Sequence, residues 1–370
     1  MSFNKKKILF LSPLPPPNYG SALSSKDCLE ILKKSKKFSV ESIKLNYSRE
    51  MTDVGKISLE KIKGFFSVLK IINQKISNFK PHFVYFVPAT SNFGLIRDFF
   101  FVRFIKKSKI PILFHIRSRL IKNRLNNFFY KFMFSNEKAI ILGKSLIEDI
   151  INYIPKKNLF ILPNAIKNEI SDKELKKILE KRRSQKIFNI LFLSNMDKTK
   201  GWPKLLESAR ILMDRGFSFN CFFAGSWQNK EDECFFFNYL KKNNLEDVVF
   251  YIGQIKPEEK KDLFSKVHLL VFPTEYPLET FGRVIIEAMM YALPVIANSI
   301  ATIPSIIEDK KTGFLLNENS PIEISERIET LLKNRKLAEK KGLNGRKAFL
   351  KKFEIKNYEK NFLEILSFAY

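Results

Sequence analysis

The chain has 370 residues, more than one ordinary hydrophobic core supports, so two domains are expected. No apolar run approaches the length of a membrane-spanning helix, and the three cysteines form no Cys-x-x-Cys or Cys/His cluster, so we expect no transmembrane helix and a reducing, metal-free setting. The net charge of +27 is concentrated in residues 1–170, which hold 31 Lys and Arg against 11 Asp and Glu. This excess predicts an anionic partner: lipid head groups, a phosphorylated acceptor or nucleic acid.

The first element in chain order is an apolar run at residues 7–12, followed by the loop PLPPPNYGSALSS. We interpret the run as a strand rather than a signal peptide, because prolines end it early and no small-residue cleavage site follows. Gly20 would let the backbone of the loop approach a ligand closely. Ser21 and Ser24 are candidates to cap the helix expected over residues 22–37.

Three basic, Phe-rich segments in the N-terminal half have the apolar spacing of amphipathic helices. They cover residues 56–79, 93–107 and 119–134. Such helices can pack against a sheet and leave their lysines in water, or they can lie on an anionic membrane surface. The two interpretations are compatible, and the sequence leaves both open.

A short apolar run at residues 111–114 predicts a strand that ends at His115, with Arg117 and Arg119 just beyond it. Ligands of α/β sheets bind at the carboxyl ends of the strands. These three side chains are therefore candidates for a site. His82 and His268 have no such context and are interpreted as structural.

The first domain is expected to end near Ile166, after a strand at residues 159–162. Residues 167–186 are mostly charged, which favours a crossover between domains over a core element. A second domain then starts with a buried strand at residues 188–193, and Lys200-Gly201 lies just before the next helix.

Residues 267–297 are the most informative segment, because two apolar strands bracket a helix and form a βαβ unit. In such a unit the helix N-terminus offers unpaired N–H groups to an anion such as a diphosphate. Glu279 lies at the mouth of this helix and Glu287 lies eight residues on. At the helical rise their separation is roughly 12 Å, about the reach of a sugar nucleotide. One carboxylate would then accept hydrogen bonds from a sugar and the other from a ribose.

The segment FPTEYPLETFGRVIIEAMMYALPVIA, with Glu279 and Glu287 in an E-x7-E pattern, resembles the donor-site signature of retaining GT-B glycosyltransferases, in particular family 4. The resemblance spans essentially the whole chain and is most specific in residues 188–316. It implies an α/β fold of two Rossmann-like doubly wound parallel-sheet domains that face each other across a cleft. The implied division is an acceptor-binding domain (1–166), a linker (167–186), a nucleotide-sugar-binding domain (187–352) and a helix that packs back on the first domain (353–370).

The chain departs from the family pattern at the diphosphate clamp. The family has a basic residue after the first strand of this domain and a Lys before the following Gly. Lys200 matches the Lys, whereas Asn195 replaces the basic residue and supplies an amide without charge. Lys198 and Arg283 are candidates to substitute for the missing charge.

A second departure lies in the segment ATIPSIIEDKKTGFLLN, which resembles the family's Gly-Gly-x-Pro-Glu-Ile sequence. Here Ala301 and Ser305 replace Gly and Glu. These replacements bear on local detail and leave the expected fold unchanged.

The resemblance and the strand-end positions together give the candidate site residues. The catalytic candidates are His115, implied near the transferred sugar, and Glu279. The donor-binding candidates are Gly20, Asn195, Lys200, Gly253, Ile255, Thr280, Phe281, Gly282, Arg283 and Glu287. The acceptor-binding candidates are Tyr19, Ser21, Arg117 and Arg119.

The function implied is a retaining glycosyltransferase that moves a sugar from a nucleotide-diphosphate sugar to a glycan or lipid-linked acceptor, in bacterial surface polysaccharide, lipopolysaccharide or glycolipid assembly. No Asp-x-Asp motif occurs, so we expect neither a metal nor another cofactor. The expected location is the cytoplasm, with peripheral contact to an anionic membrane at its inner face. The alternatives are a basic nucleic-acid-binding protein and a non-catalytic scaffold, although no nucleic-acid module is recognisable.

Overall fold

The computed structural model describes residues 5–16, 19–45 and 59–370. The chain forms two compact units, one of Met1–Ala165 with Lys356–Tyr370 and one of Ile166–Ile355. The residues expected to form a linker, 167–186, belong to the second unit and contain the helix α6 (Asp172–Ser184).

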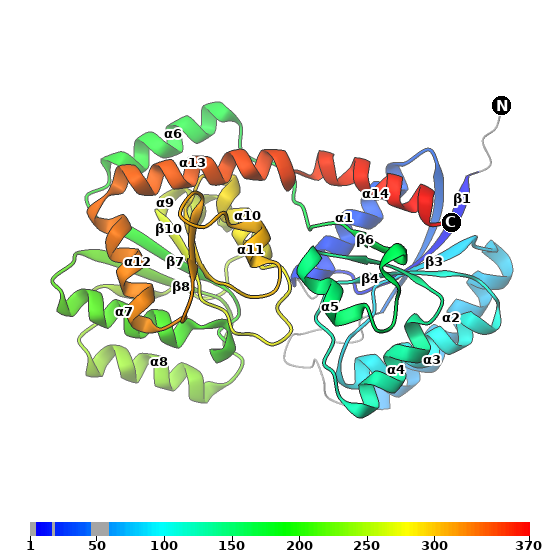
Figure 1. Ribbon diagram of the computed structural model, residues 1–370. Helices are drawn as coiled ribbons and strands as arrows, with labels where there is room; N and C mark the ends of the chain where they lie inside the picture. The colour runs from blue at the N-terminus through cyan, green and yellow to red at the C-terminus, as the bar shows by residue number, and fades with distance from the viewer. Residues whose placement is uncertain (1–4, 17–18, 46–58) are drawn as a thin grey trace. The chain divides into compact units, whose positions relative to one another are not determined.

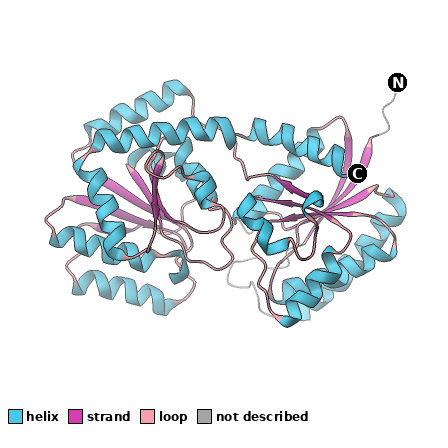
Figure 2. Cartoon of the chain, viewed as in Figure 1, coloured by secondary structure: helices cyan, strands magenta, loops and turns pink. Residues whose placement is uncertain are grey.

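The first unit is built on a six-stranded parallel sheet in the order β2-β1-β3-β4-β5-β6 (Figures 1 and 2). Its strands are β1 (Lys6–Ser12), β2 (Phe38–Lys44), β3 (Phe83–Phe86), β4 (Ile112–Ile116), β5 (Lys138–Ile141) and β6 (Leu159–Ile161). The strand order reverses direction between β1 and β3, which makes the carboxyl ends of these strands the topological switch point of the sheet. Every residue of β3 and β4 is buried, as expected for strands covered on both faces.

Helices cover both faces of this first sheet. Within the unit, α2, α3 and α4 lie side by side, whereas α1 and α14 lie on the opposite face (Figure 1). Side chains of the central strands alternate accordingly, because Phe114 contacts Phe134 of α4 and Tyr85 contacts Phe362 of α14. The helices of the unit are α1 (Gly20–Lys34), α2 (Leu59–Phe79), α3 (Asn92–Lys107), α4 (Arg124–Phe134), α5 (Ile147–Ile150) and α14 (Ile355–Ala369).

The second unit repeats the plan with a parallel sheet in the order β12-β11-β10-β7-β8-β9. Its strands are β7 (Phe188–Leu193), β8 (Phe219–Ala224), β9 (Val249–Tyr251), β10 (Leu269–Phe272), β11 (Val295–Asn298) and β12 (Gly313–Leu316). Besides α6, its helices are α7 (Trp202–Asp214), α8 (Lys230–Lys242), α9 (Pro257–Lys266), α10 (Arg283–Met290), α11 (Ile303–Ile306), α12 (Pro321–Lys333) and α13 (Arg335–Lys352). Here the strand order reverses between β7 and β10. The prediction of two Rossmann-like parallel-sheet units is confirmed.

Several expected boundaries were wrong for local reasons. Helix α4 begins at Arg124 rather than at residue 119, because the Asn123 side chain caps it by accepting a hydrogen bond from the backbone N–H of Asn126. Helix α1 begins at Gly20, so Ser21 lies inside the helix, as does Ser24, and neither caps it. Residues 56–58 of the first amphipathic segment lie outside the described residues, and α2 is described from Leu59.

Candidate active site

Two of the predicted site residues, Lys200 and Glu279, lie at the switch point of the second sheet. The loop after β7 carries Lys200, and the loop after β10 carries Glu279. A backbone hydrogen bond of 2.7 Å from the Glu275 N–H to the Thr199 carbonyl joins the two loops. Because these strands are adjacent and parallel, both loops leave the sheet at its carboxyl edge, where ligands of this kind of sheet bind.

The carboxylate of Glu279 occupies a nest of backbone amides at the start of α10. Its Oε1 accepts hydrogen bonds from the N–H groups of Thr280 (3.2 Å), Phe281 (3.4 Å) and Gly282 (3.0 Å). A phosphate oxygen would accept the same bonds at a helix N-terminus. The carboxylate therefore stands where an anionic ligand group would bind, and it satisfies these amides from within the chain.

The ammonium group of Lys200 faces the same carboxylate. Its Nζ lies 2.9 Å from Glu279 Oε2 and 3.9 Å from the centre of the Tyr276 ring. Only 15% of the Lys200 side chain and 12% of the Glu279 side chain are exposed, so this ion pair is screened less than a surface pair. One cation and three amides thus converge on a single anionic group.

Two glycines shape the backbone around this nest. Gly201 caps α7 with φ +85°, and a Cβ at this position would lie 2.1 Å from the Pro273 carbonyl oxygen at the end of β10. Gly282 precedes α10 with φ +69°, and a Cβ there would meet Ile285 at 2.9 Å. Both positions lie in the left-handed region that favours glycine, so the loop geometry depends on these two residues.

The second predicted carboxylate, Glu287, is also ion-paired. Its Oε2 lies 2.8 Å from Lys260 Nζ on α9, and its Oε1 lies 3.8 Å from Arg283 Nε on the first turn of α10. Lys260 was missed by sequence reasoning, because it lies among several charged residues of an amphipathic helix and nothing in the pattern distinguishes it. The structure therefore pairs each predicted carboxylate with at least one cation.

Of the residues considered to replace the missing basic residue at Asn195, Lys198 points to a different part of the unit. Its Nζ lies 2.7 Å from Asp232 on α8 and 5.6 Å from the Phe235 ring centre. Asn195 itself is half-buried directly after β7. Among the cations considered from the sequence, Lys200 and Arg283 are the two that lie beside the predicted carboxylates.

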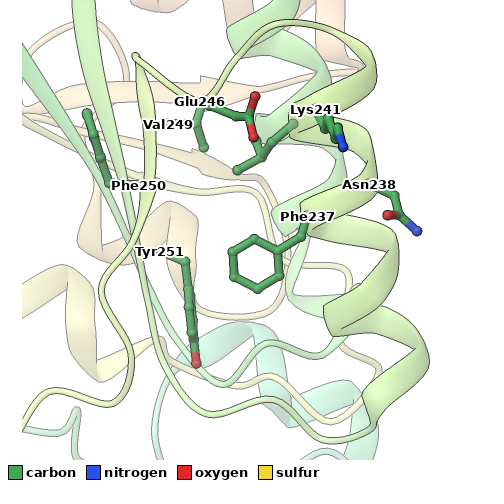
Figure 3. A pocket seen from close by; sticks show the side chains of 8 residues that line it. Phe237, Asn238, Lys241, Glu246, Val249, Phe250 and Tyr251 are labelled. Carbon is green, nitrogen blue, oxygen red and sulfur yellow. The ribbon is translucent and has the colours of Figure 1, made fainter.

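The predicted residues Gly253 and Ile255 follow β9. The Gly253 carbonyl accepts a hydrogen bond of 2.8 Å from the Gly225 N–H, which ties this loop to the end of β8. Nearby, a surface pocket of about 410 Å³ lies between α8 and β9. Phe237 and Tyr251 face one another in it (Figure 3). None of the predicted site residues lines this pocket, so it is separate from the amide nest.

In the first unit, His115 is the penultimate residue of β4, one residue before the strand ends, and it is fully buried. Its Nδ1 contacts the Tyr85 hydroxyl and lies 3.3 Å from Arg117 Nη2. A guanidinium group only donates, so Nδ1 accepts and the proton of the neutral ring lies on Nε2. Burial, and then the charge of Arg117, hold the pKa of His115 well below its usual value. Nε2 has no hydrogen-bond partner among the described residues, which leaves a neutral N–H donor.

Arg117 was predicted to contact an acceptor, but the structure buries it beneath the strand ends. Besides His115, it donates to Asn164 Oδ1 at 2.9 Å and to Cys28 Sγ at 3.1 Å. The Tyr358 hydroxyl of α14 also contacts this sulfur, at 2.9 Å. Arg117 therefore links His115 to Asn164 and Cys28 inside the first unit and does not point to solvent. Cys28 and Tyr358 were missed, because one lies in an ordinary helix and the other in the terminal helix, with no motif around either.

The remaining acceptor candidates lie at the surface or near it. Arg119 is exposed and forms a bidentate ion pair with Asp149, with N–O distances of 3.0 and 3.2 Å. Tyr19 is the residue before α1, and Gly20 opens that helix with open space around the position of a Cβ. The Ser21 backbone carbonyl accepts a hydrogen bond of 2.9 Å from the Ser25 hydroxyl.

Within the part of the chain that the structure describes, no group of three His, Cys, Asp or Glu side chains could hold a metal ion. None of the described helices combines the length and the apolar character needed to cross a bilayer.

Residues 171–348 match the protein family described as glycosyl transferases group 1. Over 176 residues the chain is 31% identical to an uncharacterized 41.2 kDa protein in the cps region of Klebsiella pneumoniae, covering 46% of each chain. It is 30% identical over 168 residues to the capsular polysaccharide biosynthesis glycosyltransferase CapM of Staphylococcus aureus, covering 45% of this chain and 42% of that protein. The chain thus matches about half the length of these curated relatives.

Two solved structures share the fold over almost their whole length. Sucrose-phosphate synthase of Thermosynechococcus elongatus superposes with a TM-score of 0.78 at 15% identity, covering 98% of both chains. Anabaena HepE in complex with UDP and glucose superposes with a TM-score of 0.74 at 16% identity, covering 98% of this chain and 99% of that one. Identities this low establish the fold alone, which is the GT-B fold expected from the sequence.

Proposed function

We propose that the protein is a glycosyltransferase that moves a sugar from a nucleoside-diphosphate sugar to a glycan or lipid-linked acceptor. The observation that carries the proposal is the convergence of Lys200 and three backbone amides on one anionic group at the switch point of the second sheet. The match of residues 171–348 to group 1 glycosyl transferases supports the same reaction class. A UDP-sugar is the donor to test first, because HepE has been seen with UDP and glucose.

In the proposed donor complex, the diphosphate takes the amides and the Lys200 ammonium that Glu279 holds in the free chain. Glu279 then turns to accept hydrogen bonds from hydroxyls of the donor sugar. Glu287 exchanges its contact with Lys260 for the ribose hydroxyls. The amides and the cation stabilise the negative charge that grows on the diphosphate as the bond from the sugar breaks, which is the kind of stabilisation that lowers such barriers most.

The transfer that we propose is retaining and uses front-face attack. The bond from the sugar C1 to the phosphate oxygen breaks while a bond from the acceptor oxygen to C1 forms on the same face, and the leaving phosphate takes the acceptor proton. No protein nucleophile, metal or cofactor takes part in this scheme. His115 supplies a neutral N–H donor for a sugar substrate, since its low pKa makes it a poor proton acceptor near neutral pH.

The setting that we propose is bacterial surface polysaccharide, lipopolysaccharide or glycolipid assembly. The name of CapM supports polysaccharide synthesis. The three free cysteines fit a reducing cytoplasm, and the cationic first unit fits peripheral contact with the inner face of the cytoplasmic membrane.

The test is a panel of nucleotide sugars, assayed for thermal stabilisation and for nucleotide release with EDTA present throughout. We expect one donor to stabilise the protein, and we expect Lys200→Ala or Glu287→Ala to abolish the effect. Lys198→Ala is the matched control, because this lysine lies two residues earlier in the same turn but pairs with Asp232. If no sugar nucleotide stabilises the wild-type chain, the proposal fails. If EDTA removes the activity, the metal-independent scheme fails.

A further inference from the structure

A strip of phenylalanine rings in mutual contact crosses α2, α3 and α4 in the first unit, with the buried ring of Phe99 joining the exposed rings of α3 and α4. The aromatic strip consists of Phe65 and Phe66 on α2, Phe99 and Phe100 on α3, and Phe128 on α4. Along it the ring centres lie 5.3, 6.1, 5.4 and 6.1 Å apart, from Phe66 to Phe128. One ring on each helix is open to solvent: Phe66 is 64% exposed, Phe100 47% and Phe128 61%.

Further apolar side chains extend the aromatic strip along the same helices. Leu125, one turn before Phe128 on α4, is 60% exposed, and Phe93, two turns before Phe100 on α3, is 51% exposed. Single exposed apolar residues are ordinary, but a contiguous set across three neighbouring helices marks an interaction surface.

Cations accompany each exposed ring at helical spacing. Residues three, four or seven apart share one face of a helix, so cations at these spacings from an exposed ring flank it on the surface. These flanking cations are Lys63 and Lys70 around Phe66, Arg103 and Lys107 after Phe100, and Arg124 and Lys131 around Phe128. All six are exposed. The aromatic strip is thus bordered by cations on every helix.

This part of the chain has almost no acidic residues. Residues 61–136 contain 15 Lys and Arg but a single acid, Asp98. Asp98 is fully buried, where it accepts hydrogen bonds from the Ala89 N–H and from Arg97. Asp98 is therefore paired with Arg97 inside the unit, and the charged side chains that residues 61–136 expose are all positive.

We propose that the aromatic strip and its six flanking cations dock the protein on an anionic lipid bilayer. The rings and Leu125 would enter the head-group and acyl boundary, while the lysine and arginine heads reach lipid phosphates. Nucleic acid is the weaker fit, because an aliphatic side chain such as Leu125 gains nothing from stacked bases. The inference deepens the membrane contact proposed above and does not depend on which sugar is transferred.

The experiment is flotation of the full chain with phosphatidylcholine vesicles, with and without phosphatidylglycerol, at low and high salt. We expect binding only with phosphatidylglycerol, weakened by salt. The variant Phe66→Ser/Phe100→Ser/Phe128→Ser should bind at least tenfold more weakly. A matched control is Phe235→Ser/Phe237→Ser, which removes two rings of α8 in the second unit that are 47% and 45% exposed, and it should bind as the wild type does.

A second variant isolates the charges by changing all six flanking cations to Ser, and it too should lose at least tenfold. Circular dichroism and the stabilisation by nucleotide sugar report whether each variant is folded. The inference is overturned if the wild type ignores phosphatidylglycerol or if either variant binds the vesicles normally. It is also overturned if an RNA duplex displaces the vesicles and if RNA binding is lost in the cation variant but not in the ring variant.

The two proposals fail separately in these measurements. If the protein binds a nucleotide sugar but no vesicles, only the membrane-docking proposal is refuted. If it binds vesicles but responds to no nucleotide sugar, only the glycosyltransferase proposal is refuted.

Discussion

The two units share one sheet plan but differ in whether their functionally interesting cations are paired with carboxylates. In the second unit, the cations predicted for the donor are matched by carboxylates: Lys200 by Glu279 and Arg283 by Glu287. In the first unit, residues 61–136 expose no acid, and although Lys75, Lys106 and Arg119 pair with acids outside this stretch, the six flanking cations of the aromatic strip are not among those pairs.

The difference follows from the kind of anion each surface would meet. A small ligand arrives at one fixed point, so an internal carboxylate can hold its cation and amides in place until the ligand displaces it. A bilayer is extended and has no fixed contact points, so its cations need no fixed arrangement. Charges paired inside the second unit thus indicate a precise site, whereas the flanking cations beside exposed rings in the first unit indicate an extended surface.

The largest effect is expected from a substitution that the backbone around the proposed donor site cannot accommodate. In Gly201→Ala, the new Cβ would lie 2.1 Å from the Pro273 carbonyl oxygen, at φ +85°. We expect a loss of about 3 kcal/mol or more in the free energy of unfolding, because the end of β10 cannot move aside cheaply. Denaturant unfolding followed by circular dichroism measures it.

The control for that change is Gly216→Ala, which has a similar φ of +77° but open space around its Cβ. It should cost only the left-handed strain of about 1–2 kcal/mol. Equal losses in the two variants would show that the contact with Pro273 contributes nothing.

A smaller effect sharpens the idea that Glu279 holds the place of an anion. In Glu279→Gln the side chain is uncharged, so it competes less with a bound anion for Lys200 and for the backbone N–H groups of residues 280–282. We therefore expect free UDP to bind about three- to tenfold more tightly than to the wild type, which is about 1 kcal/mol. Sugar transfer should fall at the same time, because the donor sugar loses its carboxylate. Isothermal titration with UDP and a transfer assay separate the two results, and weaker UDP binding would contradict the placeholder interpretation.

The sequence predicted the fold because its local signals agree. The runs at residues 188–193 and 267–272 are apolar except for Asn189 and His268, as nearly fully buried parallel strands allow, and each is followed by a helix with the spacing that fits it. The positions of Lys200 and Glu279 at strand ends followed from the same pattern. Strand order then brought them together, which the periodicity of one strand cannot show.

The partners of the site residues could not be predicted, because they come from elements distant in the chain. Lys260 reaches Glu287 from another helix, and Tyr358 reaches Cys28 from the terminal helix. The burial of Arg117 was missed for the same reason. A strand-end arginine is equally compatible with solvent or a ligand until the helices that cover it are placed.

A buried histidine in each unit gives a further comparison. Burial lowers the pKa of His268 to about 4 from 6.5, and it holds the pKa of His115 well below its usual value. Between about pH 4 and 6.5 the unfolded chain therefore binds protons that the folded chain does not, so stability falls as the pH falls through this window. Each histidine contributes up to about 1.4 kcal/mol per pH unit there.

Chemical unfolding between pH 7 and pH 5 tests this expectation. His268→Asn keeps an acceptor for the Asn189 N–H, which Nδ1 now accepts at 3.0 Å, and it should flatten the pH slope. His115→Asn should flatten it independently. His82→Asn is the control, since His82 accepts a backbone N–H from Lys7 but is exposed. A slope that survives both buried changes would assign the acid sensitivity to other groups.

The smallest effect concerns Ala301, where the chain departs from the glycine of the resembled family. Its φ of +46° lies in the left-handed region, which costs an alanine about 1–2 kcal/mol but costs a glycine nothing. Glycine loses about 0.5–1 kcal/mol through its freer unfolded chain, so Ala301→Gly should stabilise the second unit by about 0.5 kcal/mol. Ala348→Gly, inside the C-terminal part of α13, should instead destabilise it by about 1 kcal/mol, because no such strain is relieved there. If the melting temperature rises in Ala301→Gly and falls in Ala348→Gly, the alanine at position 301 costs stability through its backbone conformation alone. Destabilisation by both variants would mean that the Ala301 methyl group contributes packing that outweighs its strain.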